Sequence, residues 1–264
     1  MAIEKVARAM SWSVVARVTR FTSGLIANII IVRSLGAHDW GILSVVKSFV
    51  GFAFVIIMMG LGNALLKFTP AVRVKGDISQ FTREFKKLVV LQVVVWVLLL
   101  VIIAIFSDGI NSIYGGQFER FSYYLIFAIG FVLFEVFMVL ITNLLQSWYE
   151  TRMLAVVILY SNIGYLAILV LFIKFGLGIV GILAAGGIVN LCASLLLIPE
   201  IRKLTAGADT AVSKNYPGAG RILKFSLPFV VTGFLNQIVW RQSEVIFLGH
   251  YHGAKFAGYF GLAY

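Results

Sequence analysis

Seven long apolar runs dominate the chain and leave few ways for it to fold. They lie at 12–33, 42–66, 88–106, 122–147, 153–174, 179–199 and 225–248, and an eighth begins near 255 and ends at the last residue of the sequence. A helix of about 20 apolar residues crosses a hydrocarbon layer of about 30 Å. Backbone polar groups in that layer must be bonded within the protein, which excludes open strands and loops. The runs therefore predict an all-α fold, a polytopic transmembrane helix bundle.

The composition supports a membrane protein. Of the 264 residues, 61% are hydrophobic and 12% are charged, whereas soluble domains carry about 25% charged and about 45–50% apolar residues. The runs are also too long and too unbroken for the strands of a membrane barrel. Arg17 and Arg20 interrupt the first run, and no small-residue cleavage site follows it. We therefore expect the first helix to be retained rather than removed as a signal peptide.

Lysine and arginine are distributed unevenly between the two sides of the predicted bundle. Fourteen fall on the side of the N-terminus: Lys5, Arg8, Lys67, Arg73, Lys75, Arg83, Lys86, Lys87, Arg152, Arg202, Lys203, Lys214, Arg221 and Lys224. Only four fall on the other side: Arg33, Arg120, Lys174 and Lys255. Short loops rich in Lys and Arg stay in the cytoplasm. We therefore predict a multi-pass protein of the cell (cytoplasmic or inner) membrane with a cytoplasmic N-terminus.

The chain divides into two groups of helices. We predict an N-terminal six-helix bundle over 1–199, a flexible cytoplasmic linker over 200–224, and the start of a second, apparently truncated bundle over 225–264. A short repeat supports the division, because the pattern G-A-x-x-x-G occurs at 36–41 and again at 253–258, about six helices later. Two parallel halves related by pseudo-symmetry are a common transporter architecture.

Polar residues share one face in two of the predicted helices. Arg17, Arg20 and Asn28 line one face of the first helix, together with Ser13 and Gly24. In the seventh, Gln237, Arg241 and Glu244 share a face with Gly233. When Leu35-Gly36 is aligned with Leu248-Gly249, Gly24 falls on Gln237 and Asn28 on Arg241. The coincidence favours a common water-lined cavity. The alternatives are that Arg17 and Arg20 snorkel to the cytoplasmic surface and that Arg241 pairs with Glu244.

Two further charges fall inside predicted spans. Glu135 lies in the middle of the fourth span, where an isolated carboxylate is protonated or paired. We expect its partner to be Arg17, Arg20 or Lys47. Glu135 then serves either as one half of a salt bridge that packs the helices or as a proton-coupling residue. Lys47 lies toward the outer part of the second span and either snorkels or lines the cavity.

The intramembrane basic residues suit an anionic ligand, because guanidinium groups bind phosphate oxygens bidentately and stay charged when desolvated. We predict a binding site for an anionic head group, made by Arg17, Arg20, Asn28, Lys47, Gln237 and Arg241, with Glu135 and Glu244 as coupling or ion-pair residues. No P-loop, G-x-S-x-G or H-E-x-x-H motif occurs in the sequence. We therefore expect no enzyme activity, no catalytic residue, no cofactor, no metal site and no nucleic-acid partner.

Four segments resemble the polysaccharide exporter and O-antigen flippase family, which belongs to the multidrug, oligosaccharidyl-lipid and polysaccharide exporter superfamily. They are 31–43 (IVRSLGAHDWGIL), 60–68 (GLGNALLKF), 223–229 (LKFSLPF) and 258–264 (GYFGLAY). The resemblance implies two bundles of six or more helices that work by alternating access. It implies a substrate such as a polyprenyl-diphosphate-linked oligosaccharide, flipped during polysaccharide, O-antigen or lipopolysaccharide synthesis, and polysaccharide polymerase or other assembly proteins as partners.

The same resemblance implies twelve to fourteen spans, whereas this sequence stops as its eighth begins. We therefore expect 1–264 to be a fragment, a truncated product or a half that needs a partner. Two rival functions remain open. A cation-coupled multidrug exporter of the same superfamily would place Glu135 at the centre of the cavity. A non-transporting membrane assembly protein would work without Arg17 and Arg20.

Overall fold

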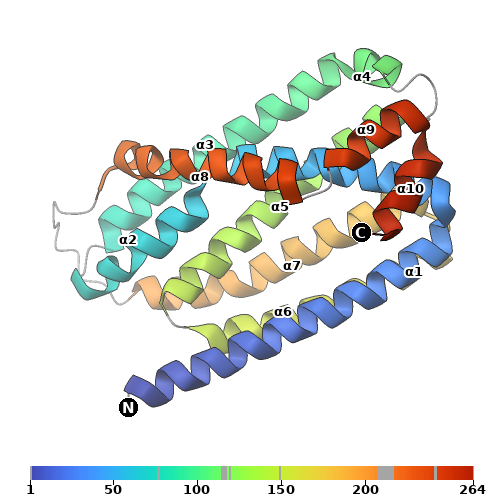
Figure 1. The fold of residues 1–264 in the computed structure, drawn as a ribbon. Helices are drawn as coiled ribbons and strands as arrows, with labels where there is room; N and C mark the ends of the chain where they lie inside the picture. The colour runs from blue at the N-terminus through green and yellow to red at the C-terminus, as the bar shows by residue number, and fades with distance from the viewer. Residues whose placement is uncertain are drawn as a thin grey trace.

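The described residues of the computed structural model fold into ten α-helices (Figure 1). The structure describes residues 2–75, 78–113, 118, 120–148, 150–206, 217–240 and 243–263. The helices are α1 (Ala2–Met58), α2 (Leu61–Lys75), α3 (Ile78–Ile105), α4 (Ser107–Ile113), α5 (Phe121–Ser147), α6 (Thr151–Lys174), α7 (Gly178–Ala206), α8 (Ala219–Trp240), α9 (Ser243–His252) and α10 (Ala254–Ala263). The prediction of an all-α polytopic bundle is confirmed.

Helix α1 is a hairpin that contains the first predicted span and most of the second. It turns at Gly36, whose φ of 74° and ψ of 175° are not helical, and its second arm runs back from the turn at an angle to the first (Figure 1). The prediction of one continuous helix over 42–66 is wrong. Met59 and Gly60 have φ values of 51° and 67°, which interrupt the span between α1 and α2. Glycine adopts such values without a steric penalty, whereas methionine does so rarely.

The start of the second half is also broken into shorter helices. The predicted span 225–248 is divided between α8 and α9, with residues 241–242 outside the described part of the chain. Gly253, with a φ of 85°, separates α9 from α10. Both ends of the predicted linker 200–224 are helical, since α7 continues to Ala206 and α8 begins at Ala219. The middle of that linker, 207–216, lies outside the described residues.

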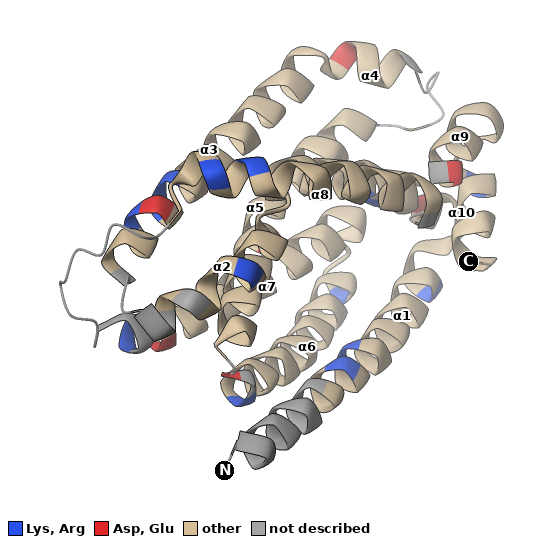
Figure 2. Cartoon of the chain, turned by 60° about the vertical axis from the view of Figure 1, so that its left-hand side comes forward, with Lys and Arg blue, Asp and Glu red and all other residues tan. Residues whose placement is uncertain are grey.

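Six helical stretches are long and apolar enough to cross a membrane, which makes the chain a multi-pass membrane protein. The first covers Val14–Pro70 and includes the first two predicted spans, which explains why seven predicted spans correspond to six stretches. Lys and Arg gather at the end of the bundle that carries the N-terminus and the starts of α3, α6 and α8 (Figure 2). Few lie at the opposite end, near α4, α9 and α10 (Figure 2).

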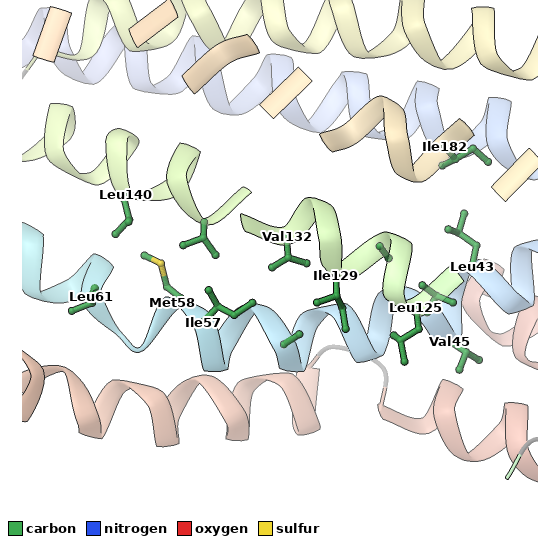
Figure 3. Close-up of a cluster of buried hydrophobic side chains, with 14 of the residues drawn as sticks. Leu43, Val45, Ile57, Met58, Leu61, Leu125, Ile129, Val132, Leu140 and Ile182 are labelled. Carbon is green, nitrogen blue, oxygen red and sulfur yellow. The ribbon is translucent and has the colours of Figure 1, made fainter. Parts of the chain in front are cut away.

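Helix α5 lies at the centre of the bundle and contacts α1, α2, α3, α4, α6 and α7. Its main partner surface in Figure 3 is the second arm of α1, toward which Leu125, Ile129 and Val132 point. Leu43 and Ile57 of α1 are fully buried against this face. Packing here depends on shape complementarity. The hydrophobic effect does not drive apolar helix faces together inside a bilayer, because the lipid chains are as apolar as the side chains. The bundle thus centres on α5, and α8, α9 and α10 each contact α1.

Candidate substrate-binding site

The first arm of α1 carries three different stripes along its length. Ser23, Ala27 and Ile31 are buried and belong to the side of α1 that packs beside α6. Val18, Phe21 and Leu25 form an exposed apolar stripe on the far side. The predicted polar stripe lies between these two, because each of its residues follows a buried or half-buried position by one residue along the helix. It consists of Arg17, Arg20, Gly24 and Asn28, all exposed.

The exposed arginines of α1 do not lie on its exposed apolar stripe. Figure 2 shows basic residues part-way along α1 rather than only at its N-terminal end. An arginine at the bilayer centre costs about 2.5–3.5 kcal/mol on insertion scales and usually faces protein or water. The polar stripe of α1 thus lies beside the packed face of this arm and apart from its exposed apolar stripe.

Lys47 and Glu135 interact across the second arm of α1 and helix α5. The carboxylate of Glu135 acts electrostatically on the Lys47 ammonium, which lies deep among protein atoms. The Lys47 side chain is nevertheless exposed. Its Nζ also lies 5.4 Å from the ring centroid of Trp40, within the range of a cation–π interaction. Of the three partners expected for Glu135, the structure brings Lys47 to it.

Gln237 is the one predicted site residue of α8 that the structure describes. It is 8% exposed, and its Nε2 donates a long hydrogen bond of 3.4 Å to the carbonyl oxygen of Ser48. A Cβ at Gly51 would collide with the Gln237 amide, so the two helices approach closely here. Gln237 thus packs α8 against the second arm of α1, next to Lys47. Glu244 is exposed in the first turn of α9, and Arg241 lies outside the described residues.

The two copies of the G-A-x-x-x-G pattern pack against each other. A Cβ at Gly41 would collide with the carbonyl oxygen of Ala254, and a Cβ at Gly258 would collide with that of Ala37. The contact is reciprocal, because each glycine meets the alanine of the other copy. Small residues allow such backbone-to-backbone contact between membrane helices. Helices α1 and α10 are therefore joined around a local pseudo-two-fold axis.

This contact also fixes the register of the repeat. Gly36 and Gly253 precede the two contact segments and have similar positive φ values of 74° and 85°. They are therefore equivalent, which makes the sequence alignment of Leu35-Gly36 with Leu248-Gly249 wrong by four residues. Four residues are about one helical turn, so the corrected register pairs Gln237 with a residue one turn away from Gly24. In the corrected register Arg20 corresponds to Gln237, and Gly24 corresponds to position 241.

A second junction between α8 and the first half lies at the end that carries the N-terminus. Glu84 of α3 has a side chain only 8% exposed. Its Oε2 accepts a hydrogen bond of 2.9 Å from the backbone N–H of Ala219, and its Oε1 accepts one of 2.8 Å from Lys87 Nζ. Nearby, Lys67 Nζ lies 3.8 Å from the ring centroid of Phe225. Sequence reasoning missed this junction, because Glu84 looks like an ordinary loop charge until α8 is placed beside it.

Replacing Glu84 with alanine is expected to lower the free energy of unfolding by about 1 kcal/mol, because the first turn of α8 loses an anionic hydrogen-bond acceptor. The measurement is the melting temperature of the detergent-solubilised protein. Glu200→Ala is the matched control, since Glu200 pairs only within its own helix with Lys203 at 3.6 Å and exposed pairs contribute little. Equal losses in the two variants would contradict an anchoring role for Glu84.

Comparison with known protein families agrees with this architecture. The model of a family described as "Polysaccharide biosynthesis protein" matches residues 6–264, which is nearly the whole chain. Neither the curated proteins nor the solved structures gave a match. The family match covers α1 with its polar stripe and also α8 to α10, which supply Gln237 and the second copy of the repeat.

Proposed function

The chain belongs to the polysaccharide biosynthesis protein family, and from that premise we propose that it transports a lipid-diphosphate-linked oligosaccharide. The substrate is turned from the cytoplasmic to the outer leaflet of the cell membrane by alternating access, and the N-terminus lies in the cytoplasm. The chain acts as a transporter rather than as an enzyme. Its partners are the polyprenyl-diphosphate-linked substrate, membrane lipid and the polymerase or other proteins of polysaccharide assembly.

The observation that carries the proposal is the polar stripe of α1. Arg17, Arg20 and Asn28 are exposed within a helix long enough to span the membrane, and they lie beside its packed face rather than on its apolar face. Two guanidinium groups one turn apart suit a diphosphate, which offers several oxygens to their N–H groups. The oligosaccharide then follows the head group through the interior while the hydrocarbon chain stays in lipid.

Lys47 and Gln237 extend the same chemistry to the second arm of α1 and to α8. Lys47 has an exposed side chain on the second arm of α1, with Glu135 as its counter-charge. When an anionic head group binds, the proposal has Lys47 exchange Glu135 for the phosphate. The proposal includes Arg241, which follows Gln237 by four residues in the sequence.

Changing both Arg17 and Arg20 to alanine is expected to reduce surface polysaccharide about tenfold, which corresponds to the loss of about 1.4 kcal/mol of head-group binding. The gene is expressed in a strain that lacks its own flippase, and polysaccharide at the cell surface is measured beside the amount of inserted protein. Arg33→Ala is the matched control, because Arg33 is an exposed arginine of the same arm but lies outside the stripe. Single Arg17→Lys and Arg20→Lys variants are expected to retain part of the activity.

Two results would overturn the proposal. Normal surface polysaccharide from a fully inserted double variant would remove the role of the polar stripe and favour an assembly protein that does not transport. Loss of export in Arg33→Ala to the same extent would mean that positive charge in general, rather than this stripe, is required.

A cation-coupled exporter is the second candidate, and the Lys47–Glu135 interaction favours it. A carboxylate that exchanges between an internal lysine and a cation is a suitable coupling group. Under this candidate, Glu135→Gln abolishes transport while the Arg17 and Arg20 double variant remains active. The opposite pattern supports the anionic substrate.

A further inference from the structure

A cavity of about 480 Å³ lies away from the polar stripe, between α1, α3, α4, α5 and α9. Two of the helices that line it, α4 and α9, lie at the end of the bundle opposite the N-terminus (Figure 1). Apolar side chains line almost all of it, among them Phe52 of α1, Leu99 and Ile103 of α3 and Phe247 of α9. Leu125 and Ile129 of α5, which point toward α1 in Figure 3, contribute to the same lining.

Water is a poor occupant for this cavity. A buried water needs two to four hydrogen-bond partners, and the lining offers polar side-chain groups only in His250 and Tyr251. These two rings stack edge to face with their centroids 4.7 Å apart, and both lie at the end of α9. The rest of the cavity presents carbon to whatever occupies it.

The cavity adjoins exposed apolar side chains of α9 and α3. Phe247 and Tyr251 line it and are still 64% and 72% exposed. On the opposite wall, the lining residues Leu99 and Ile103 alternate with Leu98 and Ile102, which are exposed apolar side chains of the same spanning helix. The medium at such a surface is hydrocarbon, so a chain from the bilayer reaches the cavity without crossing water. The His250 and Tyr251 rings supply the polar side-chain groups of the lining, and aromatic residues with a polar group suit the level at which the polar end of a lipid meets its chain.

We propose that this cavity binds one acyl chain of a bilayer phospholipid, held between α3 and α9, with its glycerol region beside His250 and Tyr251. The chain fills the space between the central bundle and α9, and so adds to the direct contacts that α9 makes with α1. The site is separate from the polar stripe and does not rest on the proposed transport function.

Ala53 gives a clean test, because it is buried and lines the cavity, and a larger side chain there occupies the space of the acyl chain. The protein, purified in a lipid-free detergent, is titrated with a palmitoyl-oleoyl phosphatidylethanolamine, and the melting temperature and bound lipid are followed by thermal unfolding and native mass spectrometry. We expect one retained phospholipid and a rise in the melting temperature for the unchanged protein. Ala53→Leu is expected to lose both, with a lipid-free melting temperature at or above that of the unchanged protein.

Ala104→Leu is the matched control, because Ala104 is an exposed alanine of α3 that does not line the cavity, and it is expected to behave like the unchanged protein. A phospholipid that carries a photoreactive diazirine in its chain is expected to label peptides containing Leu99 or Phe247, and less so in Ala53→Leu. Labelling that Ala53→Leu leaves unchanged would overturn the proposal. Retention of a polyprenyl phosphate in place of phospholipid would also overturn it and would identify the cavity as a substrate-tail site.

Discussion

Replacing Gly258 with valine is expected to separate α10 from α1 and to lower the free energy of unfolding by about 3 kcal/mol. The collision is with the backbone carbonyl oxygen of Ala37 rather than with a side chain. A flexible side chain can rotate away from a new methyl group, but two helix backbones in contact can only move apart. Gly41→Val is expected to have a similar effect, since its Cβ would meet the backbone of Ala254.

The two substitutions act on one contact, so their effects are expected to be less than additive. Once one valine has pushed the helices apart, the second meets space that is already open. Thermal unfolding of the two single variants and the double variant gives this coupling directly. Gly164→Val is the control, because it makes the same change in a membrane-spanning helix at a position with no atom within 4 Å of the new Cβ. Fully additive losses at 41 and 258 would contradict the reciprocal contact.

Adjacent glycines of α7 are expected to respond to alanine in opposite directions. A Cβ at Gly187 would collide with the ring and Cβ of Phe131 on α5, whereas a Cβ at Gly186 meets nothing within 4 Å. Gly187→Ala is therefore expected to cost about 2 kcal/mol from overpacking. Gly186→Ala is expected to raise stability by up to about 1 kcal/mol, because alanine favours the helix more than glycine does.

The same thermal unfolding measurement tests this pair, and each variant serves as the control for the other. Helix propensity is matched at the two neighbouring positions, so the difference between the variants reports the α5–α7 contact alone. If Gly187→Ala is as stable as Gly186→Ala, the close approach of Gly187 to Phe131 between α7 and α5 is contradicted.

The sequence was sufficient to predict the helical class and the approximate positions of the spans, because apolar length alone requires helices in a bilayer. It could not locate the break at Met59 and Gly60, since methionine in a left-handed conformation leaves no signal in a hydropathy profile. It also extended the linker too far at both ends. Helices in the interfacial region continue through polar residues, so the end of an apolar run does not mark the end of a helix.

For the candidate site, the sequence predicted which face of α1 is polar but could not choose a partner for Glu135. Helical periodicity places residues on a face of one helix, whereas the approach of Lys47 to Glu135 depends on how α1 and α5 pack. The repeat was found correctly, yet its first alignment was offset by one turn. Leu-Gly pairs are common in membrane helices, and only the matching φ values of Gly36 and Gly253 separate the two registers.

The contact between α1 and α10 joins residues made at very different times during synthesis. Gly41 is added to the growing chain roughly 200 residues before Gly258. This is a delay of roughly 10–40 s at ordinary rates of translation. During that interval Ala37 and Gly41 have been synthesised but α10, their partner helix, has not. Alanine and glycine suit this interval, because they expose no unsatisfied side-chain polar group to lipid. They also present little side-chain surface to which other newly inserted helices could bind. A contact built from backbone and small residues thus suits a partner that arrives late in membrane insertion.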